Sequence, residues 1–507
     1  MAIKSFEESQ SGIKIYSGHP WSLIKSGFLV LTWIILGFHL ELVGPTMPIL
    51  AVNAQVDYSG MGSALASRSA GYLVVNILGA ILQNIVKKHS EGLLVCAFIL
   101  SAIVVFATPF VKSLMLMCVL FFFHGTAQGL TDLGGANILL TMWGMNAAAP
   151  LNTVHLGYGI GAVFVNLLVR PFLTQKVLSN TVTDSERINS TLSSVNATKT
   201  NSNIVIPYTI TAVLCVLIAA GHIFFYIREL RSQRQKLPVQ QIIDYTAVSI
   251  NPENVNRSVN EENSSPYSSH TYGRGFFRYN LTLSIIFICY MFFIGGNDQT
   301  FSKFFFTYLK FEKFNISTGA ASWGIILYWL SYSIGRLIGA VASVFLSVNM
   351  CLNIVSCGGL CVAIAWLIFV WAIGLTGTSL FILGAATGLV LAPLFPLSFG
   401  LFNQKLNVMP MLIALLLCGS AIGGIALQKI AGFVMDLNPN HFSTLLILCI
   451  LMSIILYVAS NLVYAFYQRK DLSNARSSVT DGAALSLEGF NEEEQLVTNR
   501  LKDQEDE

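Results

Sequence analysis

Charged side chains are scarce in this sequence. Only 11% of the 507 residues are Asp, Glu, Lys or Arg, against about 25% in an ordinary soluble domain. Apolar residues make up 54% of the chain, and the mean hydropathy is +0.64. The net charge is only +3, and no basic patch is interleaved with aromatic residues, so we expect no nucleic-acid partner. These deficits exclude a soluble globular protein and indicate a polytopic membrane protein.

Cysteines are few, and all 9 lie in apolar segments. None falls in a long polar loop, so no disulfide framework is predicted. Cys351, Cys357 and Cys361 are close together, but no His or carboxylate accompanies them. We interpret these cysteines as small residues that pack between helices, and we expect no metal site. The amino terminus also lacks a cleavable signal, because the apolar stretch after its polar first 25 residues is too long.

Long apolar runs, in contrast, are abundant. A helix that crosses a membrane needs about 20 mostly apolar residues. Twelve segments meet this length: Leu23–Leu50, Ser63–Val86, Leu93–Val111, Leu114–Leu140, Pro150–Leu173, Ile204–Ile227, Tyr279–Asp298, Ala320–Leu346, Leu352–Leu375, Leu380–Phe402, Met409–Val434 and Ser443–Tyr467. The predicted fold is therefore an all-α polytopic membrane protein with twelve transmembrane helices.

A polar segment rich in Asn, Ser, Gln and charge separates the sixth span from the seventh. It cannot pack a core, so we predict a flexible linker between two six-helix bundles. This layout resembles that of major facilitator transporters, and the resemblance implies that each bundle is built from inverted three-helix repeats. The predicted divisions are an amino-terminal tail at 1–22, a first bundle at 23–228, a linker at 229–275, a second bundle at 276–468 and a disordered acidic tail at 469–507.

Basic residues gather before the first span and after the second, sixth and twelfth spans. These positions share one side of the membrane, so both termini are predicted to be cytoplasmic. The polar loop 174–203 falls on the other side, where the sequons at Asn189 and Asn196 are predicted glycosylation sites. We expect a monomer in the plasma membrane.

The fourth span carries His124, Gln128 and Asp132 at intervals of four, which places them on one helix face. A carboxylate at mid-membrane costs about 2.5–3.5 kcal/mol, so it marks a functional site by default. Glu41 in the first span is a second such acid, and no nearby membrane cation obviously neutralises either one. Desolvation makes such a group take up a proton or hold a cation, unless it is a structural acid hydrogen-bonded within its bundle. Asp132, supported by Glu41, is the predicted coupling site for a co-transported cation, and no resident cofactor is expected.

The inverted repeats make spans 1, 4, 7 and 10 equivalent and place them around a central cavity. Planar amides, carboxylates and aromatic faces recognise sugars, because hydroxyls need paired donors and acceptors. The predicted substrate contacts are Gln128, His124, Asn137, His155, Asn297, Gln299 and Trp323. His39 and His124 are equally well explained by packing, and Trp323 by contact with lipid. Arg336 and Asp298 are a possible charge pair, although Arg336 could snorkel and Asp298 could be a solvated helix terminus.

Several motifs resemble those of the major facilitator superfamily. They are Gly44-Pro45-Thr46, the run from Gly125 through Asp132 to Asn137, His155-Leu-Gly-Tyr-Gly-Ile-Gly161 with Arg170-Pro-Phe172, Gly335-Arg336-Leu337 and Pro393-Leu-Phe-Pro396. The chain is most similar to the branch of sodium-dependent glucose transporter 1 and major facilitator superfamily domain-containing protein 4, which is related to fucose permeases. The loop after the second span, from Gly79 to Lys88, departs from the family motif. This departure implies weaker charge contacts on the inward side of the membrane.

The resemblance implies transport by alternating access, with acids on spans 1 and 4 serving substrate binding and proton coupling. Glu41 and Asp132 match those spans, whereas the glucose-transporter branch implies sodium. We expect a carrier of a glucose-like hexose together with a cation, Na⁺ being favoured over H⁺. A carrier of another small polar or anionic solute, with Arg336 binding the anion, and a solute sensor remain alternatives. No nucleophile–base pair or metal-spaced cluster indicates an enzyme.

Overall fold

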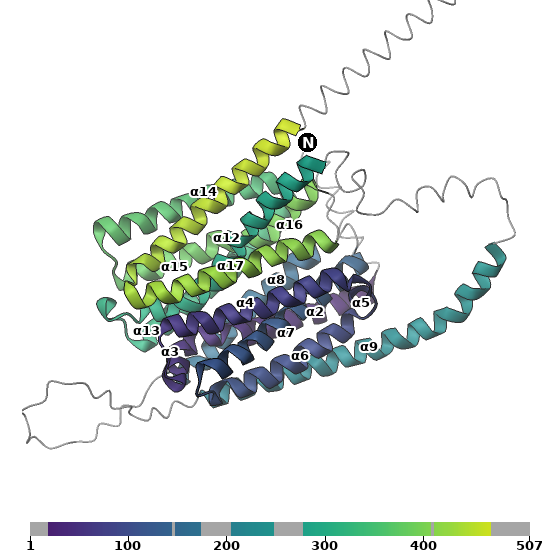
Figure 1. The fold of residues 1–507 in the computed structure, drawn as a ribbon, viewed down its shortest axis with the longest axis horizontal. Coiled ribbons are helices and arrows are strands. Elements are labelled where there is room, and N and C mark those ends of the chain that lie inside the picture. The colour runs from purple at the N-terminus through teal and green to yellow at the C-terminus, as the bar shows by residue number, and fades with distance from the viewer. Residues whose placement is uncertain (1–18, 144–147, 174–203, 248–276, 407–409, 468–507) are drawn as a thin grey trace, which may run out of the picture.

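The computed structural model describes residues 19–143, 148–173, 204–247, 277–406 and 410–467 (Figure 1). All regular structure within these ranges is helical, and twelve of the described helices are long and apolar enough to cross a membrane. The predicted all-α fold with twelve spans is therefore confirmed. Asn189, Asn196, most of the predicted linker and nearly all of both predicted tails lie outside the described residues.

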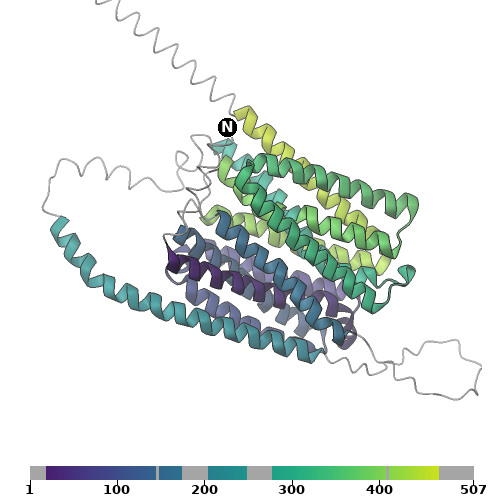
Figure 2. The ribbon, with the colours of Figure 1, turned by 180° about the vertical axis from the view of Figure 1, so that it is seen from behind.

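Two groups of helices lie side by side along their lengths (Figures 1 and 2). The first half comprises α2 (Pro20–Glu41), α3 (Val43–Ala54), α4 (Tyr58–Ile81), α5 (Gln83–Lys88), α6 (Ser90–Ala107), α7 (Leu114–Trp143), α8 (Ala148–Val169) and α9 (Val205–Ala247). The second half comprises α12 (Phe277–Leu309), α13 (Thr318–Phe345), α14 (Val348–Ile368), α15 (Gly377–Leu391), α16 (Leu394–Lys405), α17 (Pro410–Leu437) and an unlabelled last helix, Asn440–Tyr467.

The first and tenth spans are each broken into two helices, α2 with α3 and α15 with α16. Proline causes both breaks, because it has no N–H to donate to the carbonyl four residues earlier. Pro45 therefore leaves the carbonyl of Glu41 without a helical partner, and Pro393 and Pro396 interrupt the tenth span. Broken helices at membrane depth occur where the backbone faces protein or a cavity. Glu41 ends α2 at such a place.

Two helices extend beyond their predicted ends. The seventh span, α12, continues past Asp298 to Leu309, because the polar side chains in this stretch face the protein interior and do not end the helix. Asp298 is therefore not a solvated helix terminus. The sixth span, α9, runs on to Ala247, so the first part of the predicted linker is helical.

The two halves are joined at the end of the bundle where α3 ends and α4 begins, which we call the loop end. The Asp436 carboxylate of α17 accepts hydrogen bonds from the backbone N–H groups of Tyr58, at 3.1 Å, and Ser59, at 2.7 Å. It thereby caps the first turn of α4 from the opposite half. The Lys429 ammonium also donates to Ser63 across the same contact, at 2.6 Å. The loop end is therefore closed.

Candidate functional site

A cavity of about 70 Å³ lies between the two halves. Its wall includes residues from spans 1, 4, 7 and 10, as the repeat plan predicts, and also from spans 2, 5, 8 and 11. Six Asp, Glu, Lys and Arg residues line it, with equal numbers of acids and strong bases: Glu41, Asp132, Asp298, Arg68, Lys303 and Arg336. Amides and aromatic rings form the remaining polar surface, including Gln128, Gln299, Trp33, Tyr72, His155, Tyr158 and Trp329. A cluster of charged side chains inside a membrane-spanning bundle is a functional site by default.

Glu41 is held by a cation and a phenol. Its Oε1 atom forms a salt bridge with the Lys303 ammonium of α12 and accepts a hydrogen bond from the Tyr158 hydroxyl of α8. Glu41 and Lys303 are both almost fully buried. The expectation that no membrane cation neutralises Glu41 is therefore wrong. The cation was missed because Lys303 lies beyond the predicted end of the seventh span.

Asp132 has a different environment. It is half-buried on α7, lines the cavity and lies within hydrogen-bonding reach of the Tyr72 hydroxyl on α4. In the part of the chain that the structure describes, no Lys, Arg or His forms an ion pair with Asp132. Its carboxylate can therefore exchange a proton or a small cation without first giving up a protein counter-charge.

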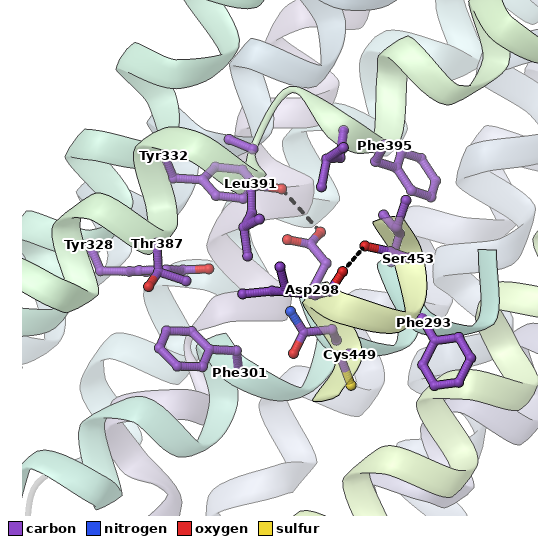
Figure 3. A pocket seen from close by; sticks show the side chains of 15 residues that line it. Phe293, Asp298, Phe301, Tyr328, Tyr332, Thr387, Leu391, Phe395, Cys449 and Ser453 are labelled. Atoms are coloured by element: carbon purple, nitrogen blue, oxygen red, sulfur yellow. Dashed lines mark hydrogen bonds between the residues drawn. The ribbon is translucent and has the colours of Figure 1, made fainter. Parts of the chain in front are cut away.

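Asp298 is linked to Arg336 through a tyrosine. The Tyr332 hydroxyl donates to Asp298 at 3.0 Å and accepts a hydrogen bond from the Arg336 guanidinium. Asp298 and Tyr332 line a second, smaller cavity of about 20 Å³. Figure 3 shows them there beside Phe301, Tyr328 and Thr387. Asn297 also lines this smaller cavity. Arg336 is buried, so it does not snorkel to an interface.

Three further predicted substrate residues line the larger cavity: Gln128, His155 and Gln299. The Gln299 amide accepts a hydrogen bond from Ser69 at 3.2 Å and donates one to Ser420 at 3.2 Å. The His155 ring packs edge-on against Trp33, with ring centroids 6.2 Å apart. Amides and rings thus face the same space as Asp132.

The other three predicted substrate residues do not line either cavity. His124 is buried and shares a hydrogen bond of 2.7 Å with His39. Asn137 donates to the Ser90 hydroxyl at 2.6 Å. Trp323 is 49% exposed and lies under the Arg170 guanidinium, 4.4 Å from the ring centroid to Cζ. His124 and Asp132 share one broad face of α7. Asp132, at one end of this face, lines the cavity, whereas His124, at the other end, lies in the interior of the first half.

Sequence reasoning missed Arg68 and Tyr72 on α4, both of which line the cavity. The signal for Arg68 was present, because a strong base inside the second predicted span calls for the same functional interpretation as an acid there. Tyr72 carries no such signal, since tyrosines are common in membrane spans. It is identified only by its position beside Asp132.

Comparisons with known proteins agree with this architecture. The sequence model of the Major Facilitator Superfamily matches residues 29–426. The chain belongs to the Major Facilitator Superfamily. It is 20% identical to mouse sodium-dependent glucose transporter 1A over 80% of this chain and 88% of that protein. It is 30% identical to zebrafish sodium-dependent glucose transporter 1, but that match spans 29% of this chain and only 24% of the relative.

A solved structure has the same fold. The Escherichia coli fucose:proton symporter superposes with a TM-score of 0.52 and 15% identity, over 87% of this chain and 99% of that chain. At this identity the likeness shows the fold alone. The chain is thus a transporter of the Major Facilitator Superfamily, an integral membrane protein related to sodium-dependent glucose transporters.

Proposed function

We propose that this protein is a secondary transporter that moves a glucose-like hexose together with a cation. The observation that carries the proposal is the position of Asp132, a carboxylate in the cavity wall with a phenol beside it and no ion-pair partner among the described residues. An acid without a counter-charge in a low-dielectric cavity gains most from a proton or a small cation.

The lining of the larger cavity supports a sugar as the main cargo. Each sugar hydroxyl both donates and accepts hydrogen bonds, so it needs partners of both kinds. Gln128 and Gln299 offer an acceptor and a donor each, and Trp33 and Trp329 offer apolar ring surface for the C–H face of a pyranose. An anionic cargo held by Arg336 receives less support, because Arg336 is linked through Tyr332 to Asp298.

The closed loop end supports alternating access. Asp436, Lys429 and their partners on α4 hold the two halves together there, and these contacts must separate for the cavity to open at that end. From the position of the loop end and the distribution of basic residues, we assign the loop end to the outside of the plasma membrane and both termini to the cytoplasm.

Sodium is the cation that we favour over the proton. Hydroxyl and amide oxygens near a carboxylate are hard ligands suited to a small cation, and Gln128 and Tyr72 lie with Asp132 in the cavity wall. The names of the relatives, sodium-dependent glucose transporters, point the same way. The name of the fucose:proton symporter keeps the proton as the second candidate.

Uptake of labelled glucose into vesicles that contain the purified protein tests this function. We expect accumulation above the outside concentration when an inward sodium gradient is imposed, and loss of accumulation when choline replaces sodium. A pH step without sodium should drive little uptake. Accumulation driven by the pH step alone would assign the coupling to protons. Glucose uptake that does not depend on either gradient would contradict a coupled mechanism. The absence of uptake of any hexose would overturn the proposed cargo.

A further inference from the structure

Arg68 and Glu41 line the larger cavity, and each has buried polar atoms without a hydrogen-bond partner among the described residues. The Nε and Nη1 atoms of Arg68 are buried and have no hydrogen-bond partner among the described residues, and the same holds for the Oε2 atom of Glu41. Both residues are 2% exposed, and both line the cavity. The charge of Glu41 acts on the Arg68 guanidinium. A buried donor or acceptor without a partner is costly, so each such group needs an explanation.

The two groups are complementary in kind. The guanidinium only donates hydrogen bonds and the carboxylate oxygen only accepts them. Oε1, the other oxygen of Glu41, is already occupied by Lys303 and Tyr158, which fix the direction of the carboxylate. A hydroxyl satisfies both partners at once, because its O–H can donate to Oε2 while its lone pairs accept from the guanidinium.

We propose that Arg68 and Glu41 together bind one hydroxyl of the transported sugar and set the specificity of the carrier. This inference rests on the proposed hexose function and deepens it. It separates the roles of the two membrane acids: Glu41 contacts the sugar, and Asp132 contacts the cation. Arg68 comes from α4 and Glu41 from α2, while Lys303 comes from α12 of the second half. The hydroxyl therefore lies where both halves meet.

The specificity follows from the chemistry of the pair. A site that is built to hydrogen-bond a hydroxyl strongly rejects an analogue that lacks it, because buried polar groups are then left unpaired. A fluorine in the same place accepts weakly and cannot donate, so it leaves Glu41 Oε2 unsatisfied. An inverted hydroxyl points away from both groups. We therefore expect one ring position at which the deoxy, fluoro and epimeric sugars all compete poorly.

Competition against labelled glucose by a complete set of monodeoxy and monofluoro glucoses tests this inference in reconstituted vesicles. In the natural protein, the deoxy sugar at one position should bind about tenfold more weakly or worse, with little recovery by fluorine. In Arg68→Met, which replaces the guanidinium by an unbranched apolar side chain, the penalty at that position alone should fall to below about threefold. Arg68→Lys, which keeps a charge and a donor, should retain an intermediate penalty and guards against a folding defect of the first variant.

A matched control is Gln128→Leu, another change in the cavity wall, which should alter the penalty at a different ring position or none. Equal weakening of all analogues by Arg68→Met and Arg68→Lys would overturn the inference, since it indicates a structural role. A loss confined to glucuronate competition would also overturn it, because Arg68 would then bind a carboxylate. If the natural protein takes up no hexose, the proposed function fails as well. If it takes up hexoses with no position-specific penalty, only the Arg68–Glu41 inference fails.

Discussion

Glu41 and Asp132 are chemically similar acids in the wall of one cavity, yet their surroundings differ. Glu41 is 2% exposed and is held by the Lys303 ammonium and the Tyr158 hydroxyl. Asp132 is half-buried and has the Tyr72 hydroxyl beside it, with no ion-pair partner among the described residues. A membrane acid therefore acquires its role from groups on other spans. A carboxylate with a fixed counter-charge can position a ligand, whereas one without it can bind a mobile cation.

The sharpest test of this difference removes each negative charge separately. Asp132→Asn should abolish accumulation of glucose against its gradient, because the amide can neither take up a proton nor neutralise a cation. Exchange of labelled for unlabelled glucose should survive. Glu41→Gln should weaken glucose binding in exchange but keep the dependence on the cation gradient for whatever uptake remains. The measurement is uptake with and without the gradient, and in exchange mode.

The opposite pattern would contradict the separate roles assigned to Glu41 and Asp132. If Glu41→Gln uncouples uptake from the gradient while Asp132→Asn still accumulates glucose, Glu41 is the coupling acid. Quantifying the protein in each vesicle preparation keeps a loss of expression from being mistaken for a loss of coupling.

The second test concerns the ion pair itself. Lys303→Met should destabilise the protein by about 3–5 kcal/mol, because it leaves the buried Glu41 carboxylate without its cation. Adding Glu41→Gln in the same chain should recover much of this loss, since the uncompensated charge is then gone. Thermal denaturation in detergent, followed by size-exclusion chromatography, measures both variants. Arg336→Met is the matched control, and Glu41→Gln should not rescue it.

A double variant as unstable as Lys303→Met alone would contradict the assignment of Lys303 as the counter-ion of Glu41. Full stability of the single variant would contradict it too, because Arg68 would then suffice to balance Glu41.

A finer test uses the two tyrosines beside the two acids. Tyr72→Phe should raise the cation concentration for half-maximal uptake by about two- to tenfold, because Asp132 loses a hydrogen-bond donor. Tyr158→Phe should leave that concentration unchanged and instead raise the KM for glucose, because the Glu41 carboxylate loses one of the groups that orient it. Titrations of cation and glucose on both variants distinguish the two effects. Equal shifts of the cation requirement in both variants would show that the acids titrate as one site.

The fold was predictable from the sequence because its signal is local. Each span is a run of apolar residues long enough to cross the bilayer, and the confirmed count of twelve needs no information on contacts. The break in the tenth span was predictable for the same reason, since Pro393 removes a hydrogen bond wherever it lies in a helix.

The partners within the site were not predictable in the same way. Lys303 lies in a polar stretch that, from the sequence alone, resembles the end of a helix. In the structure this stretch continues α12, and Lys303 is buried. Its pairing with Glu41 joins residues that are far apart in the chain. Likewise, His124 and Gln128 share a helix face with Asp132, but only the packing of α2 against α7 decides that His124 meets His39 and Gln128 meets the cavity.

His124 provides the mildest test, because it lies on the same helix as Asp132 but does not line the cavity. His124→Gln should change the KM for glucose and the cation requirement by less than about twofold. It should lower thermal stability modestly, because the hydrogen bond to His39 is lost or weakened in a buried place. Gln128→Leu, one helical turn closer to Asp132, should raise the KM severalfold with little effect on stability. If His124→Gln shifts the cation requirement as strongly as Tyr72→Phe does, the buried histidine pair belongs to the coupling machinery, and the boundary drawn between cavity wall and interior on α7 is wrong.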